Sequence, residues 1–315
     1  MDWLKRLRPA RLDAATRAFV AWCVSEIAPN LAHARGYPQR FAPALLAARA
    51  YCDALAQTLP APMLLARSAF VVQPQVRALF ATAAAIPAAL TQSVAVRDWF
   101  AGHDADTIHA LMGVRLHRRQ VFGLAIQGDA VQREVAQEVA SFADHTFTAL
   151  AADARALRTE IARELMFSLL TQARARVETL VAIQQALTEE KQVLQADLRA
   201  RPDAARQQRL AQCLHELHAA HAALDAESVW QHVEPLLSDP AAHLGLHPHA
   251  FGIDDTGVCH VDAAQTLRTR ITLCELRGRD RRHWMVMPVC IPRAELESAP
   301  GYAARLAEAG RWLTI

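Results

Sequence analysis

Three histidines at intervals of three residues are the side chains best spaced to bind a metal ion. His215, His218 and His221 would stand about one turn apart on a helix, where neighbouring imidazoles could share a zinc ion. The zinc-protease pattern His-Glu-x-x-His needs a spacing of four, which this stretch lacks. A solvated helix face is the simpler interpretation, and a metal-dependent enzyme is the least favoured of three functional hypotheses.

The densest local charge in the chain is an arginine-rich segment followed by a tryptophan. It comprises Arg277, Arg279, Arg281 and Arg282, with Trp284 adjacent. Guanidinium groups beside an aromatic ring suit an anionic partner such as a phosphate backbone or single-stranded nucleic acid. A solvated turn is the alternative, and no RNP, KH, helix-turn-helix or zinc-finger pattern supports the nucleic-acid hypothesis.

Two further groups of polar residues carry weaker signals. Asp144 and His145 are neighbours on an expected helix, where adjacent side chains point about 100° apart, so the carboxylate cannot orient the imidazole as a catalytic triad requires. His243, His247 and His249 have no ligand partner at a suitable spacing and are interpreted as loop composition. The chain contains no Walker loop, GxGxxG or GxSxG motif, so we expect no cofactor and favour a non-catalytic protein.

Composition restricts the class of protein. The chain has 315 residues, 52% of them apolar and 21% charged, and a formal net charge of +2, which is an ordinary globular balance with no overall field for nucleic acid or membrane. The six cysteines form no CxxC pair, which predicts reduced thiols. The N-terminal residues have no signal-peptide core, and no run of about 18 apolar residues predicts a membrane span. We therefore expect a cytoplasmic protein without membrane insertion.

Residues 1–150 are expected to form a helical bundle. Prolines such as Pro29, Pro43 and Pro74 divide the first part into short amphipathic segments, and a further helix is expected from about Asp104 to Leu116. A short β insertion near 118–131 is expected, because Val121 to Ile126 followed by Gly128 and Asp129 is typical of a strand and turn. Helical spacing resumes in a set of four residues, Val131, Val135, Val139 and Phe142.

The strongest pattern is a heptad repeat that mirrors about Pro202. Residues 151–230 are therefore predicted to form an antiparallel coiled-coil hairpin that turns at this proline. The mirrored seam pairs Leu187 with Leu217 and includes Leu214 and His221. Gln184, Lys191 and His221 are polar seam residues expected to fix the register. An isolated two-helix seam buries only a narrow stripe, so the hairpin is expected to pack on its own N-terminal bundle or on a partner.

Residues 250–315 are predicted to form a small α+β module of three or four strands. Strands are expected from Thr269 to Leu276 and from Trp284 to Ile291, with a last helix from about Ala303 to Leu313. The predicted fold is thus mainly α: an N-terminal helical bundle, a long hairpin and this module. The leading functional hypothesis is an interaction or scaffold protein that binds a protein partner or self-associates, and the alternative is a nucleic-acid-associated accessory protein acting through Arg277–Arg282.

Overall fold

The computed structural model describes residues 12–127, 130–254, 258–261, 269–278 and 284–297. The chain divides into two compact units, each built from two separate segments. Unit 1 comprises residues 1–52 and 165–244, and unit 2 comprises residues 53–164 and 245–315.

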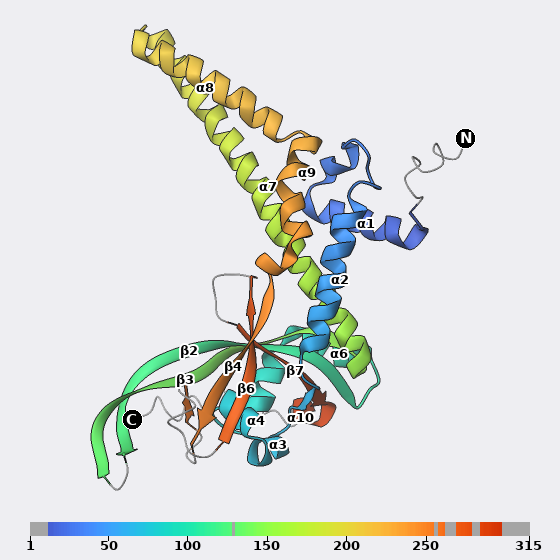
Figure 1. Cartoon of the computed structure of the whole chain (residues 1–315), viewed down its shortest axis with the longest axis vertical. Helices are drawn as coiled ribbons and strands as arrows, with labels where there is room; N and C mark the ends of the chain where they lie inside the picture. Colours follow the sequence, from blue (N-terminus) through green and yellow to red (C-terminus); the bar gives the residue numbers. More distant parts are fainter. Residues whose placement is uncertain (1–11, 128–129, 255–257, 262–268, 279–283, 298–315) are drawn as a thin grey trace. The chain divides into compact units, whose positions relative to one another are not determined.

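The elements follow one another as labelled in Figure 1. The helices are α1 (Ala14–Ile27), η2 (Pro29–His33), α2 (Ala42–Thr58), α3 (Arg67–Val72), α4 (Pro74–Leu79), α5 (Ala85–Gln92), α6 (Val94–Gly102), α7 (Ala154–Ala200), α8 (Ala204–Ala223), α9 (Ala226–Ser238), η3 (Pro240–Ala242) and α10 (Arg293–Glu297). The strands are β1 (Met63–Leu64), β2 (Thr107–Gln127), β3 (Ala130–Ala151), β4 (Gly245–Ile253), β5 (Cys259–His260), β6 (Thr269–Arg277) and β7 (Trp284–Pro292).

Unit 2 is organised around a seven-stranded sheet in the order β1-β7-β2-β3-β5-β4-β6. Strand β7 is central because one of its edges pairs along β2, while its other edge pairs with β6 at residues 284–286 and with β1 at residues 289–290. The β6–β7 pairing closes six strands into a ring. Three of its pairings, β1–β7, β2–β7 and β3–β5, join residues more than 100 positions apart, so closure of the sheet depends on non-local pairing.

The core of unit 2 lies on one face of this sheet. Alternate residues of β2 point into it, as Ile108, Ala110 and Met112 do, because successive side chains of a strand face opposite sides. Met287 and Ile291 contribute from β7. Strands β3 to β6 also contribute, and helices α3 to α6 add the apolar side chains of Ala69, Val76, Leu79, Ile86, Leu90, Val96 and Phe100.

Strands β2 and β3 are much longer than their neighbours and form a ribbon. Their pairing extends from His109 opposite Ala151 to Gln127 opposite Ala130. Strand β7 covers the edge of β2 only as far as Arg115, and β5 pairs with β3 only at residues 139 and 140. Among the pairings of the described backbone, the distal part of the ribbon therefore has no third strand. Figure 1 shows this part curving away from the other strands of unit 2.

Unit 1 is helical, and its helix starts are defined by side-chain caps. Asp13, Asp203 and Asp225 each accept hydrogen bonds from backbone N–H groups at the start of α1, α8 and α9. The fully buried Trp230 of α9 stacks on Phe41, with ring centroids 3.8 Å apart. In Figure 1, α7 and α8 lie side by side as the arms of a hairpin, and residues 201–203 form its turn.

The prediction of a mainly α fold with a small C-terminal α+β module is wrong, because the chain contains one large sheet. Residues 107–127 and 130–151 form the β2–β3 ribbon, where the sequence predicted a helix to Leu116, a short β insertion near 118–131 and then another helix. Strands β4, β6 and β7 belong to the same sheet as this ribbon, so residues 250–315 are not a separate module. The helix expected from Ala303 to Leu313 lies outside the described residues.

Candidate interaction surfaces

The distal half of the α7–α8 hairpin is the first candidate surface. Within unit 1, Arg174 of α7 bonds to Glu26 of α1, and Arg176 donates to the carbonyl oxygen of His232 in α9. Beyond Val177, the side-chain hydrogen bonds recorded for α7 are made within α7 or with α8, and no residue from 178 to 200 is buried. At 1.5 Å per residue this distal stretch is about 35 Å long.

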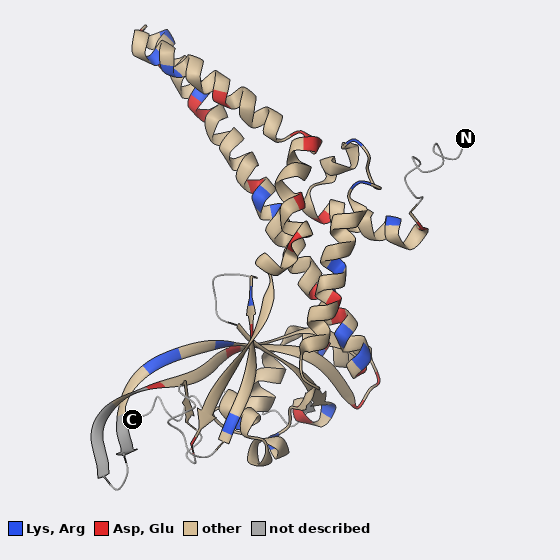
Figure 2. Ribbon diagram, viewed as in Figure 1, with Lys and Arg blue, Asp and Glu red and all other residues tan. Residues whose placement is uncertain are grey.

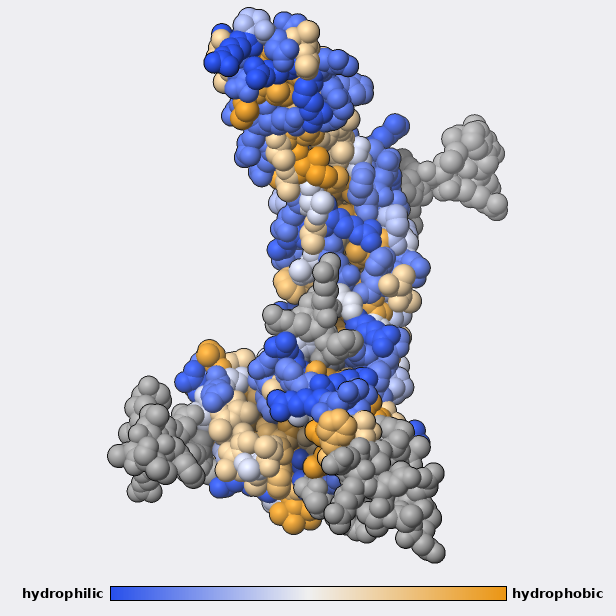
Figure 3. All heavy atoms as spheres, turned by 90° about the vertical axis from the view of Figure 1, so that its left-hand side faces the viewer, coloured by the Kyte–Doolittle hydropathy of each residue, from blue (hydrophilic) through white to orange (hydrophobic). Residues whose placement is uncertain are grey.

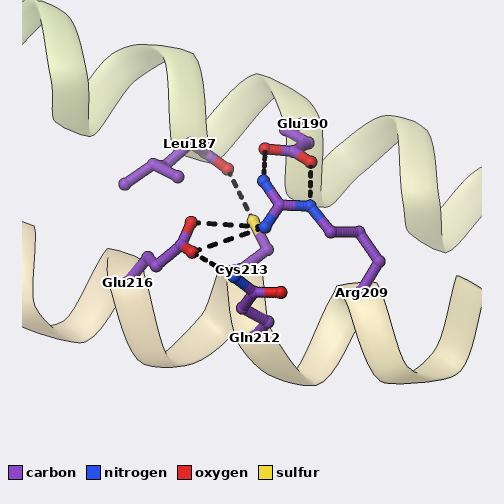
Figure 4. A network of polar contacts seen from close by, with 6 residues as sticks. All are labelled: Leu187, Glu190, Arg209, Gln212, Cys213 and Glu216. Atoms are coloured by element: carbon purple, nitrogen blue, oxygen red, sulfur yellow. Dashed lines mark hydrogen bonds and ion pairs between the residues drawn. The ribbon is translucent and has the colours of Figure 1, made fainter.

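A charged network joins the two arms at the middle of this stretch (Figure 4). The guanidinium of Arg209 donates from Nε to Glu190 Oε1 at 2.7 Å and from Nη2 to Glu190 Oε2 at 2.8 Å. Glu216 lies 3.4 Å from Arg209 Nη1 and accepts a second bond, of 2.8 Å, from Gln212. The hydrogen bonds to Glu190 raise the pKa of Arg209, so the pair stays charged. A two-pronged contact of this kind fixes the relative register of the helices.

The seam between the arms differs from the predicted one at two positions of α8. Cys213 is fully buried and donates its thiol to the carbonyl oxygen of Leu187 at 3.3 Å, and burial raises its pKa. Leu217 is 7% exposed, whereas Leu214 is 46% exposed. The prediction that Leu214 lies in the seam is therefore wrong. His221 is also exposed; its ring lies 3.2 Å from the amide nitrogen of the predicted seam residue Gln184.

The three histidines of α8 are not brought together as a metal site. All three, His215, His218 and His221, are exposed. Within the described part of the chain, no group of three His, Cys, Asp or Glu side chains is placed to hold a metal ion. His221 Nδ1 instead lies 2.8 Å from the carbonyl oxygen of Leu217, one turn earlier on the same helix.

Asp144 and His145 lie on β3 and not on a helix, and their side chains make separate contacts. Asp144 has a φ of 54°, sits at an irregularity of the β2–β3 register and accepts a 2.7 Å bond from Arg115. His145 Nε2 lies 2.8 Å from the carbonyl oxygen of Leu79, and its ring stacks on Phe80. Because the carbonyl can only accept, Nε2 carries the proton. Burial lowers the pKa of His145, so the imidazole is a neutral structural group.

The arginine-rich segment is only partly described. Arg279, Arg281 and Arg282 lie outside the described residues. Arg277 Nε donates to Glu275 at 2.9 Å, and His249 Nε2 lies 2.8 Å from the same carboxylate oxygen. Glu275 is 2% exposed, so Arg277 stabilises a buried carboxylate and is at least partly structural. His249, interpreted from the sequence as loop composition, is thus a structural residue of β4.

Trp284 begins β7 and lies beside a basic stretch that sequence reasoning did not identify. It is directly opposite Arg115 of β2 and Leu276 of β6. A Cβ atom added to Gly113 would lie 2.9 Å from Thr146 Oγ1, which is too close, and 3.5 Å from the indole ring, which is ordinary contact. The indole therefore packs over Gly113, and Thr146 is the side chain that requires a glycine there. Beyond Arg115, β2 continues with His117, Arg118 and Arg119, and Figure 2 shows the arginines of this strand as blue bands along the ribbon.

A hollow in unit 1 is lined by residues of both signs of charge. It measures about 680 Å³ and lies between the end of η2 and the start of α9. Arg40 donates two bonds to Glu227, at 2.5 and 2.6 Å, and Asp225 caps α9. Arg40, Glu227 and Asp225 are thus engaged with one another or with backbone, and His33 and Arg35 complete the polar lining.

Comparison of the chain with protein-family models, curated proteins and solved structures finds no match. Among the helices that the structure describes, none has the length and apolar character needed to cross a lipid bilayer. Function is therefore inferred from the exposed side chains of the two units.

Proposed function

We propose that this chain is a non-catalytic cytoplasmic interaction protein that binds another protein through the distal half of its α7–α8 hairpin. The observation that carries the proposal is the exposure of large apolar side chains on both arms. Ile183 and Val193 of α7 are 49% and 60% exposed, and Leu214 of α8 is 46% exposed. Figure 3 shows apolar atoms at the hairpin surface among hydrophilic ones.

The hairpin's construction supports this proposal. Two helices alone bury one narrow stripe, so a freestanding pair is only weakly stabilised by burial. The Arg209–Glu190 contact fixes the register of α7 and α8 where apolar contacts between them are sparse. An arm with a defined register and uncovered apolar residues can present a fixed helical face, which is the usual geometry of helix-mediated recognition. Self-association through the same arms is included in the proposal.

The experiment compares two triple variants that make the same chemical change. The arm variant carries Ile183→Glu, Val193→Glu and Leu214→Glu. The control carries Val71→Glu, Val72→Glu and Val94→Glu, at valines of α3 and α6 that are at least as exposed as two of the three arm residues. Far-UV circular dichroism establishes that both variants fold.

Two readouts decide the outcome. Light scattering measures the oligomeric state, and affinity capture from an extract of the source cells, quantified by mass spectrometry, measures bound proteins. We expect the arm variant alone to lose its partner or its self-association. Equal behaviour of wild type, arm variant and control in both readouts would refute the proposal.

A further inference from the structure

We propose that the outer face of the β2–β3 ribbon binds single-stranded nucleic acid along a track formed by Arg115, His117 and Arg119. This site lies in unit 2 and is independent of the hairpin surface in unit 1. The track was not identifiable from the sequence, because residues up to Leu116 were predicted to be helical.

The strand pairing places these three residues on one face. Residues of β2 with even numbers, from Ile108 to Val114, point into the core, so Arg115 and its neighbours at intervals of two point away from it. Successive members of the track are about 7 Å apart at the usual rise of a strand. Arg118 belongs to the other face, where it lies 3.7 Å from Glu138.

The track has no carboxylate directly across the ribbon. The residues opposite Arg115, His117 and Arg119 are Ala143, Ser141 and Val139. Arg115 is ion-paired with Asp144, so its net contribution to the field is small and it mainly positions the start of the track. Among the side chains described by the structure, Arg119 is exposed and has no acidic group within ion-pair distance. Arg119 is therefore the main phosphate-binding residue that we propose.

An aromatic side chain stands at the start of the same track. Trp284 is directly opposite Arg115 in the β2–β7 pairing, and directly opposed residues of neighbouring strands share a face. Trp284 is half-buried and stands where the track begins. A base can stack on an exposed aromatic ring while the backbone follows adjacent cations, which is how single strands are bound without sequence preference.

The one-residue width of the track favours a single strand over a duplex. The neighbouring strand contributes small or apolar side chains at the three opposite positions, so the polar side chains of the track form one line. A duplex presents two phosphate backbones, and cations on both strands of the ribbon would suit it better. Since a two-stranded ribbon can enter a major groove, duplex DNA is included in the test.

The test measures fluorescence anisotropy of labelled oligonucleotides titrated with the full chain. The probes are a dT 20-mer, an rU 20-mer and a 20-base-pair duplex, at roughly 50 mM salt. Arg119→Gln removes a charge from the track, and Arg118→Gln removes the same charge from the adjacent residue on the opposite face. Circular dichroism establishes that both variants fold.

Loss of one phosphate contact lowers the salt slope for a single strand by about 0.7, which corresponds to roughly eightfold weaker binding at ~50 mM salt. We expect this loss for Arg119→Gln and less than about twofold loss for Arg118→Gln. Absence of wild-type binding to either single strand would overturn the proposal. So would equal losses in the two variants, tighter binding of the duplex, or complete competition by poly-glutamate at equal charge, since each indicates no dedicated single-strand track.

Discussion

Replacing Leu217 by alanine tests the seam of the hairpin most directly. Leu217 is 7% exposed and lies in a seam between only two helices, where neighbours can partly close the space left behind. We therefore expect a cost at the lower end of the range for buried leucines, about 2 to 3 kcal/mol. Leu187, which is half-buried, should cost less, and the exposed Leu214 should cost about 0.5 kcal/mol or less.

Hydrogen exchange measured by mass spectrometry is the appropriate assay. The chain has two compact units, so a single global unfolding free energy does not isolate the hairpin. Exchange in peptides from residues 178–200 and 204–223 reports the local opening of the arms. A loss of 2 to 3 kcal/mol corresponds to roughly 30- to 150-fold lower protection, since about 1.4 kcal/mol is a factor of ten.

The order of the three variants is the decisive result. The structure requires Leu217→Ala to have the largest effect and Leu214→Ala the smallest. The heptad mirrored about Pro202 placed both leucines in the seam, so it predicts similar effects for the two. Equal loss of protection in Leu214→Ala and Leu217→Ala would refute the observed seam and support the mirrored one.

Three other predictions concern the polar and titratable groups. Arg209→Gln should lower hydrogen-exchange protection of the arms, and the difference from wild type should shrink at high salt, because the network with Glu190 and Glu216 is partly exposed and screened. Burial lowers the pKa of His145 in the folded protein, so the fold is most stable above about pH 6.5, the ordinary histidine value, where the imidazole is neutral in both states. This stability should be lost as the pH falls from about 6.5 toward the folded-state pKa. Melting temperatures measured from pH 7.5 to 5 should therefore fall less for His145→Gln than for wild type. Burial raises the pKa of Cys23 and of Cys259 to about 12, so mass spectrometry after native alkylation should find the half-buried Cys274 and Cys290 modified first.

The hairpin could be predicted because its signal is local. Helical periodicity and the proline at 202 predict two helices and a turn, and the observed helices end at Ala200 and resume at Ala204. The seam was less predictable on α8. The heptad places Leu214 and His221 in it, but both are exposed. The structure instead buries Cys213, whose thiol donates to a carbonyl oxygen of the facing helix.

Strands β6 and β7 match the strands predicted from Thr269 to Leu276 and from Trp284 to Ile291. The long β2–β3 ribbon could not be predicted, because part of what stabilises it is non-local. Val131, Val135, Val139 and Phe142 have helical spacing, and the register irregularities of β2 and β3 disrupt the alternation expected of strands. Asp144 and Ala149 have positive φ, which no sequence pattern here indicates. Strand β7 joins β1, β2 and β6, so β2 is stabilised as a strand by a partner about 170 residues away.

The same non-local origin explains why the candidate basic track was missed while Trp284 was noticed. The tryptophan stands next to arginines in the sequence, whereas Arg115 is adjacent to it only through the β2–β7 pairing. The density of charge along the sequence therefore indicates Arg277, whose guanidinium donates to the buried Glu275. It does not indicate Arg119, which is exposed on a paired strand.

Charged side chains on the ribbon have a second physical explanation, which is protection of the strand edges against aggregation. An experiment must distinguish this role from nucleic-acid binding. Among the described strands, no third strand pairs with β2 beyond Arg115 or with β3 beyond the Glu138 carbonyl, which accepts from Val261 N–H. Charged side chains on such edges prevent strand addition and aggregation. That role is satisfied by either sign of charge. Arg119→Glu should therefore leave the protein monodisperse in light scattering but abolish single-strand binding, whereas Arg119→Lys should retain both properties. If Arg119→Glu binds the dT 20-mer as wild type does, Arg119 serves only to protect the edge.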